Sequence, residues 1–218
     1  LNLIVEASEV TGKDTILEIG PGKGALTEKL LRRAKKVIAI EKDHRFIELL
    51  EKKFGDYKNF TVLEGDILDM PFEKLLPSKY KLVANIPYYI TSRILRIFLE
   101  AKVKPQSITV MVQYEVAKRI TARAPDMNLL ALSVQAYGTP RIIQKIPRSY
   151  FKPSPNVDSA IITVTDISDS FFKKNKVSTD AFFTITKKAF GQKRKKLRNT
   201  VGIESDKRPQ ELSLDQWI

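Results

Sequence analysis

The sequence of 218 residues has no cysteine, a single histidine and few glycines and prolines. The absence of cysteine excludes disulfide bonds, thiolate metal sites and cysteine nucleophiles, and it fits a cytoplasmic location. No apolar stretch approaches the ~18 residues that a membrane-spanning helix requires, so we expect no membrane partner. The only histidine, His44, follows an aspartate at a predicted helix start, which is typical of a surface or capping residue. With no carboxylate pair and no metal-ligand spacing, the sequence predicts no metal site.

The sequence also has few acidic residues relative to basic ones. It contains 25 aspartates and glutamates and 38 lysines and arginines, which gives a net charge of +13. Such an excess favours a polyanionic partner, although a Lys/Glu-rich heat-adapted surface is an alternative. The cations concentrate in the basic segment, residues 187–198, where seven of twelve residues are basic and none is acidic. Its cations are Lys187, Lys188, Lys193, Arg194, Lys195, Lys196 and Arg198. We predict that these side chains bind nucleic acid.

The first two thirds of the chain alternate short β-rich runs with helical patterns, which predicts a parallel sheet with crossover helices. The expected strands span residues 15–19, 36–40, 60–63, 81–84 and 108–112, and the expected helices span 25–34, 43–54, 91–101 and 114–122. After Pro125 we expect strands at 129–137, 141–146 and 159–165, a polar linker at 166–176 and a helix at 179–190. The pattern predicts an α/β domain over residues 1–166 and a small, basic, helical domain over 167–218.

Three glycines, Gly20, Gly22 and Gly24, directly follow the first predicted strand. Glycine lets the backbone turn tightly and approach a ligand without interference from a Cβ atom. The spacing is G-x-G-x-G and differs from the dinucleotide form G-x-G-x-x-G. Glu18, just before the glycines, would repel a pyrophosphate but favour the ammonium of a methionine moiety. We therefore expect a cradle for S-adenosylmethionine here, with a purely structural turn as the alternative.

Acidic residues also end the next two predicted strands. Glu41 ends the second, where a carboxylate in nucleotide-binding α/β sheets accepts the ribose hydroxyls. Asp66 ends the third, where its carboxylate can accept the adenine amino group while the backbone amide of Ile67 binds a ring nitrogen. Lys42 follows Glu41 and is assigned to the same cofactor site. A solvated acid beside Lys42 and an ordinary turn at Asp66 are the alternatives.

The segment Asn85-Ile86-Pro87-Tyr88 ends the fourth predicted strand and is expected to hold a substrate base. The side-chain oxygen of Asn85, which also adjoins the cofactor site, and the carbonyl of Ile86 can accept both hydrogens of an adenine N6. Pro87 fixes the loop, and Tyr88 can stack on the base. Phe151 is a candidate for the opposite face of that base, or is a core aromatic. These residues predict methyl transfer that rests on alignment and needs no strong general base.

Seven segments of the chain together resemble the KsgA-type ribosomal RNA adenine N6-dimethyltransferases, which are related to the Erm methylases. These segments are residues 18–24, 41, 65–66, 85–88, 113–119, 151–159 and 190–199. The resemblance implies a Rossmann-like class I S-adenosylmethionine-dependent catalytic domain over 1–166, with a helical C-terminal domain. It also implies dimethylation of two adjacent adenines in a 3′-terminal hairpin of small-subunit (16S) rRNA, by a monomer acting on an assembling 30S-type particle in the cytoplasm.

The family has a Gln-Asn-Phe-Leu segment that closes over the cofactor, which is expected before Leu1, and a last helix that is expected to run beyond Ile218. Without that segment we expect weak cofactor binding. Three other readings stay open. The first is an Erm-like large-subunit rRNA methylase, the second a non-catalytic RNA-binding or transcription factor on the same fold, and the third a small-molecule or DNA methylase.

Overall fold

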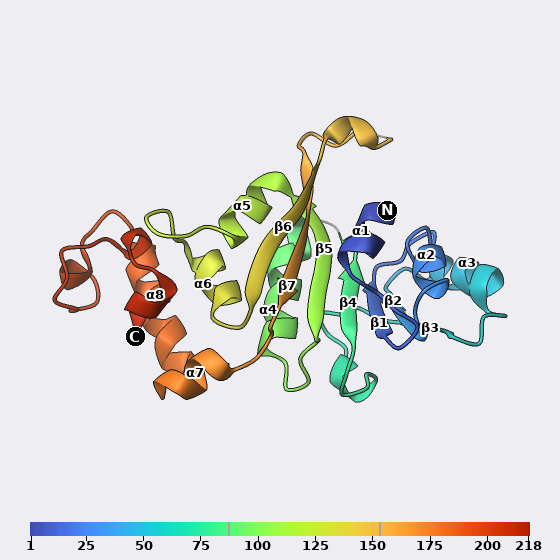
Figure 1. Ribbon diagram of the computed structural model, residues 1–218, viewed down its shortest axis with the longest axis horizontal. Helices are drawn as coiled ribbons and strands as arrows, with labels where there is room; N and C mark the ends of the chain where they lie inside the picture. The colour runs from blue at the N-terminus through green and yellow to red at the C-terminus, as the bar shows by residue number, and fades with distance from the viewer. Residues whose placement is uncertain (87, 153) are drawn as a thin grey trace.

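The computed structural model describes residues 1–86, 88–152 and 154–218, and its strands form one seven-stranded sheet in the order β3-β2-β1-β4-β5-β7-β6 (Figure 1). The strands are β1 (Thr15–Ile19), β2 (Lys36–Glu41), β3 (Phe60–Glu64), β4 (Lys81–Ala84), β5 (Ser107–Gln113), β6 (Thr139–Ile146) and β7 (Ser159–Thr165). The first five strands run parallel, and β7 pairs antiparallel with both β5 and β6. This is the expected α/β fold.

The α-helices lie between the strands and after the sheet. They are α1 (Asn2–Ala7), α2 (Thr27–Leu31), α3 (His44–Phe54), α4 (Thr91–Glu100), α5 (Tyr114–Ile120), α6 (Leu129–Gln135), α7 (Ser170–Asn175) and α8 (Thr179–Gly191). The 3₁₀ turns are η1 (Phe72–Lys74), η2 (Tyr88–Ile90), η3 (Arg148–Tyr150), η4 (Leu197–Asn199), η5 (Pro209–Glu211) and η6 (Leu214–Trp217). No helix in the described ranges has the length and apolar character needed to cross a bilayer.

The strand order creates a switch point between β1 and β4. From β1 the chain moves outward to β2 and β3, and it then returns to β4 on the other side of β1. In open α/β sheets the crossover loops part at such a point, and ligands bind there, beyond the carboxyl ends of the strands. The topology thus fixes where a site is to be sought before any side chain is considered.

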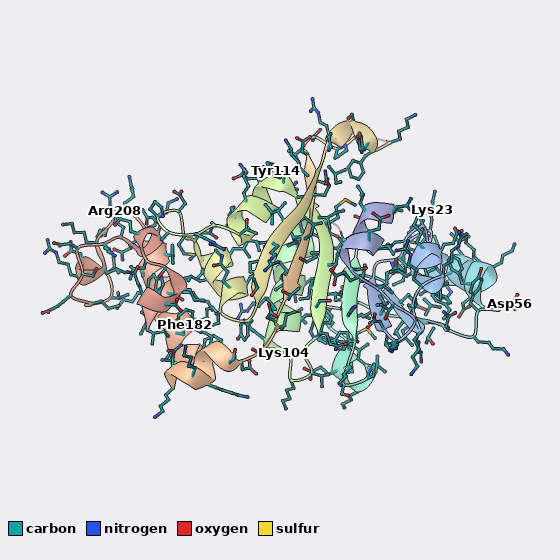
Figure 2. The ribbon with its side chains drawn as sticks, viewed as in Figure 1. Lys23, Asp56, Lys104, Tyr114, Phe182 and Arg208 are labelled. Atoms are coloured by element: carbon teal, nitrogen blue, oxygen red, sulfur yellow. The ribbon has the colours of Figure 1, made fainter. Side chains whose placement is uncertain are left out.

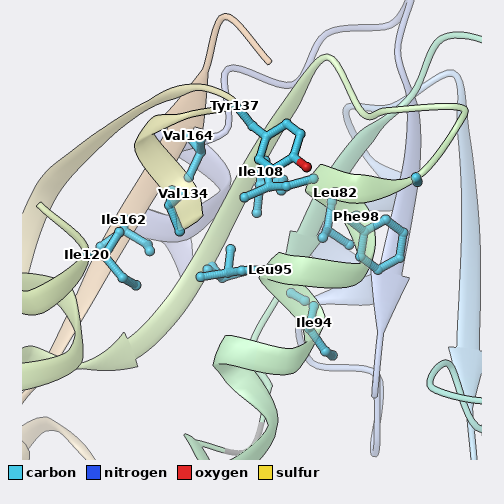
Figure 3. Close-up of a cluster of buried hydrophobic side chains, with 14 of the residues drawn as sticks. Leu82, Ile94, Leu95, Phe98, Ile108, Ile120, Val134, Tyr137, Ile162 and Val164 are labelled. Carbon is cyan, nitrogen blue, oxygen red and sulfur yellow. The ribbon is translucent and has the colours of Figure 1, made fainter. Parts of the chain in front are cut away.

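Side chains that alternate along the parallel strands build a core on each face of the sheet. In β1, Ile16 faces the cluster that also contains Ile4 and Leu30, whereas Leu17 faces the larger cluster. Leu82 and Val83 divide in the same way in β4. Figure 3 shows part of the larger cluster, with side chains from α4 among those packed against the sheet. Such burial on both faces is what parallel strands require.

Two secondary-structure predictions were wrong. Residues 129–137 form no strand but the helix α6, whose N-cap, Asn128, accepts a hydrogen bond from the Ala131 N–H at 3.0 Å. A short apolar run cannot by itself distinguish a buried helix from a strand. The predicted linker at 166–176 contains α7, because Phe172 is buried in an aromatic cluster with Phe182 and Phe183.

The elements after the sheet rest on the same core as the sheet itself. Phe172 of α7 and both Phe182 and Phe183 of α8 belong to the larger cluster (Phe182 is labelled in Figure 2). Tyr137 stacks on Phe183 with ring centroids 6.3 Å apart. A division at residue 166 remains a prediction. The helix expected at 25–34, after the glycine loop, is present but shorter than predicted, as α2.

Candidate active site

A hollow of about 890 Å³ lies at the carboxyl edge of the sheet, beside the switch point. Its lining includes five of the residues predicted to bind a cofactor, namely Gly20, Glu41, Lys42, Asp66 and Ile67. They come from the ends of β1, β2 and β3, three strands that are adjacent in the sheet. The lining does not include the other residues predicted to bind the cofactor, namely Glu18, Gly22, Gly24 and Asn85.

The glycine loop after β1 has a backbone that L-residues rarely adopt. Gly20, Gly22 and Gly24 have φ values of +63°, +53° and +76°. A Cβ atom at Gly20 or Gly22 would meet no atom within 4 Å, whereas one at Gly24 would collide with Phe54 and Leu50. Gly24 is thus required by packing, and the first two glycines leave free space at the loop surface.

The Glu41 carboxylate holds this loop against β2. Its Oε2 accepts a hydrogen bond from the Gly22 N–H at 3.0 Å, and its Oε1 accepts the N–H groups of Lys42 and Asp43 at 2.8 and 3.0 Å. The side chain is 8% exposed. A carboxylate has about four acceptor positions, so three amide donors leave Oε2 room for one more, such as a ribose hydroxyl.

Glu18 is the most perturbed group at this edge. It lies in β1, is 1% exposed, and its Oε2 has no hydrogen-bond partner. Burial raises the pKa of Glu18 to about 8, and the nearby charge of Glu41 adds to the shift, while the polar groups of Thr27 oppose it. Strongly shifted carboxyls of this kind concentrate at functional sites.

Asp66 and Lys42 form an ion pair in the lining of the hollow. The Lys42 Nζ lies 2.9 Å from Asp66 Oδ2, and the Leu68 N–H donates to Asp66 Oδ1 at 3.0 Å. The Lys42 ammonium and this backbone bond hold the pKa of Asp66 below its usual value. The carboxylate therefore stays an acceptor, as the binding of an adenine amino group demands.

Asn85 directly follows β4, next to the glycine loop. Leu17 pairs with Leu82, and continuing this parallel register places Asn85 beside Gly20. Asn85 is exposed, whereas the Ile86 side chain is only 2% exposed and anchors the loop in the core. Pro87 and the side chain of Tyr88 lie outside the described part of the chain, so their assigned roles stay predictions.

Comparison with known proteins decides the family. The family model described as ribosomal RNA adenine dimethylase matches residues 1–215. The chain belongs to the ribosomal RNA adenine dimethylase family. A protein of Dehalococcoides mccartyi named ribosomal RNA small subunit methyltransferase A is 44% identical over all of this chain and 81% of its own length. A protein of the same name from Fusobacterium nucleatum is 39% identical, over 100% of this chain and 89% of its own length.

Solved structures agree with this family in fold. A dimethyladenosine transferase from Plasmodium falciparum superposes with a TM-score of 0.78 at 33% identity, covering 91% of this chain and 70% of its own. The 23S rRNA methyltransferase ErmE superposes with a TM-score of 0.77 at 25% identity, covering 99% and 92%. The expected Rossmann-like methyltransferase fold and the expected family are both confirmed.

The residues of this family member fit S-adenosylmethionine chemically. The orphaned, buried Oε2 of Glu18 lacks the donor that a cationic group would supply. The open space above Gly20 and Gly22 admits close approach of a ligand to the backbone. Within the described ranges, no cluster of three metal-ligating side chains occurs. The observed donor and acceptor set suits an organic cation joined to a nucleoside.

Phe151, which was predicted to contact the substrate base, does not line the hollow. Phe151 is partly buried against the cluster that contains Ile4 and Ile146, which is the core-aromatic alternative given for it. Tyr89 and Arg93, which the sequence reasoning missed, line the hollow, and Tyr89 is 88% exposed. Their position in the sequence could have indicated this role, because both residues come shortly after the loop that follows β4, near the start of α4.

The basic segment runs from the last turn and a half of α8 into η4. All of its predicted cations are exposed except Lys196, which is partly buried. Lys196 and Arg198 pair with Asp206 at 3.2 and 2.9 Å, and these two cations hold the pKa of Asp206 below its usual value. Lys187 lies apart from them, on a second hollow that Arg96 and Arg119 also line. Part of the segment's charge is thus already neutralised within the fold.

Proposed function

We propose that this chain transfers methyl groups from S-adenosylmethionine to N6 of adenine in small-subunit rRNA. The observation that carries the proposal is the meeting of Gly20, Glu41 and Asp66 in one hollow beside Asn85. In its finer form, the target is two adjacent adenines in the 3′-terminal hairpin of 16S rRNA. The enzyme acts there as a cytoplasmic monomer on an assembling 30S-type particle.

The proposed cofactor contacts follow from the free acceptors of the hollow. Glu41 Oε2 offers one remaining position to a ribose hydroxyl, and Asp66 offers its carboxylate to the adenine amino group. The Ile67 backbone lies beside Asp66 for a ring nitrogen. Glu18, once ionised, balances the ammonium of the methionine moiety, and this pairing lowers its raised pKa.

When bound, S-adenosylmethionine would supply a methyl group activated by a sulfonium, and the breaking of its S–CH₃ bond would release a neutral thioether as the leaving group. Asn85 and Ile86 accept the two N6 hydrogens of the target adenine through the side-chain oxygen and the carbonyl, so that the nitrogen lone pair points at the methyl carbon. The nitrogen becomes cationic on attack and its proton is then acidic, so water can remove it. Alignment is therefore the main contribution of the protein.

The test is transfer of label from the cofactor to unmethylated small ribosomal subunits, with the labelled base mapped. Asn85→Ala is expected to remove most of the transfer while preserving RNA affinity and the fold, because the side chain is exposed and buries little surface. Gln106→Ala, which removes an exposed amide directly before β5 at the opposite edge of the sheet, is the matched control. Undiminished transfer by Asn85→Ala would refute the assigned role.

The similarity to ErmE makes large-subunit RNA the second candidate substrate. Purified small and large subunits offered in competition separate the two, and label in the large subunit alone would overturn the small-subunit assignment. Calorimetry with S-adenosylmethionine addresses the non-catalytic alternative. A chain that binds RNA but no cofactor would be such a factor.

A further inference from the structure

A short arm stands beyond the carboxyl edge of the sheet, next to the site. The arm, residues 147–152, follows β6 and contains η3 (Figure 1). Ile146 at its root pairs with Ser159, and Ser159 pairs with Gln113 at the end of β5. Because β5 is the neighbour of β4, the arm leaves the sheet at the same edge as Asn85.

The arm exposes an aromatic ring to solvent. Tyr150 is 75% exposed, whereas the next residue, Phe151, is partly buried against the core. Within the described ranges, no hydrogen bond of the Tyr150 hydroxyl and no ring contact of Tyr150 is found. The exposed Tyr150 ring, next to the partly buried Phe151, is therefore available to stack on a partner.

The backbone of the arm is braced, which fixes where this ring stands. The Arg148 N–H donates to Asp158 Oδ1 at 3.0 Å, and the Ser154 hydroxyl donates to the Arg148 carbonyl at 2.9 Å. Asp158 in turn pairs with Lys145 at 2.9 Å. Little ordering entropy is then lost when a partner contacts Tyr150.

Cations flank the exposed ring. Arg148 and Lys152 are both exposed, and the one acid beside them, Asp158, is already engaged by Lys145. Further in, the Lys145 ammonium lies 4.7 Å from the centroid of the Tyr114 ring. Aromatic rings interleaved with cations are the combination that binds unpaired nucleic-acid bases and their phosphates. The positive charge favours such a partner over an apolar protein surface.

We propose that the arm is a reader of unpaired RNA, in which Tyr150 stacks on a base close to the target adenine while Arg148 and Lys152 contact the flanking phosphates. This inference rests on the proposed function, because it takes the RNA to be seated at Asn85. It adds a contact that is separate from the basic segment.

The first test compares binding of two RNA probes, a stem-loop with two adjacent adenines in its unpaired loop and a blunt duplex of the same stem. Tyr150→Ala should weaken stem-loop affinity by about 5- to 150-fold, the range expected for one lost stacking contact, and leave duplex affinity unchanged. Tyr150→Phe should restore stem-loop binding, since the ring is kept. Tyr57→Ala, an exposed tyrosine before β3 at the opposite edge, is the matched control.

A scan of abasic positions through the loop then locates the contact. One abasic position should weaken wild-type binding and make Tyr150→Ala neutral, because the stacking partner is already gone. A double variant, Arg148→Gln with Lys152→Gln, tests the proposed phosphate contacts. It should reduce the slope of log affinity against log salt by up to ~0.7 per lost phosphate contact. Lys35→Gln with Lys58→Gln at the amino edge serves as the control.

Stem-loop affinity of Tyr150→Ala equal to that of wild type overturns the proposal, and so does an equal loss on duplex. The failure of the proposed function gives a different pattern. If Tyr150 matters for loop binding but no methyl group is transferred, the arm stands and the methyltransferase assignment falls. If methyl groups are transferred to RNA but Tyr150→Ala changes neither RNA binding nor transfer, the methyltransferase assignment stands and the proposed role of the arm falls.

Discussion

Replacing Glu18 by glutamine should stabilise the protein increasingly as the pH rises. The carboxyl is 1% exposed, and burial raises its pKa from 4.5 to about 8. In the unfolded chain the group ionises near its ordinary pKa, but in the folded chain it keeps its proton through neutral pH. Its contribution to stability is fully present below about pH 4.5 and is lost as the pH rises through about 8.

The size of the effect follows from the same shift. Each pH unit between the two pKa values costs about 1.4 kcal/mol, so the whole interval amounts to about 5 kcal/mol. Glu18→Gln has no titrating group and avoids this loss. An unsatisfied amide adds a constant penalty of about 1–3 kcal/mol, which leaves the dependence on pH unchanged.

The assay is urea denaturation of both proteins without cofactor, from about pH 5.5 to about pH 9. The unfolding free energy of Glu18→Gln relative to wild type should rise by about 1.4 kcal/mol per pH unit and level off near the folded-state pKa. Other titrating groups cancel in the difference. A flat difference for Glu18→Gln would falsify the assignment of a buried, protonated carboxyl.

Two further predictions concern the glycine loop and the basic segment. Gly24→Ala should destabilise the fold by about 1–3 kcal/mol more than Gly22→Ala in the same denaturation assay, because only its Cβ meets Phe54; equal losses would mean that φ alone matters. Neutralising residues 193–195, which have no ion-pair partner in the described ranges, should flatten the salt dependence of RNA affinity by up to ~0.7–0.9 log unit per phosphate contact. Lys196→Gln should change that slope less, since Lys196 already pairs with an acid, and the reverse order would contradict the structure.

The parallel half of the fold could be predicted because its sequence pattern and its packing agree. The strands at 15–19 and 81–84 have the predicted bounds. Both are short β-rich runs with clear limits. The helix at 129–135 was missed since its apolar run suits either structure, although Asn128 followed by leucine and alanine was a usable capping signal. Phe171 and Phe172 were the corresponding signal for α7.

The cofactor acids could be placed from sequence because parallel strands bring their carboxyl ends to one edge. Side-chain contacts could not be placed in this way. Phe151 was assigned evenly to the base and to the core, and it packs against a cluster to which α1, a helix that periodicity did not reveal, contributes Ile4 and Val5. Tyr89 lay one position beyond the recognised segment, and nothing local distinguishes a ring that points outward from one that packs.

Glu41 illustrates how such contacts change a mechanistic expectation. The sequence assigned its carboxylate to both ribose hydroxyls, but three backbone amides already occupy it, including that of Gly22. A second hydroxyl can bind only if the Gly22 N–H yields its place on Oε2. The glycine loop and the ribose therefore compete for one oxygen atom, and the position of the loop is coupled to the occupancy of the hollow. The Gly22 N–H can give up its bond to Oε2 at low cost for two reasons. Glycine adopts a φ of +53° without strain, and no atom lies within 4 Å of the position that a Cβ would take, so the loop has room to move.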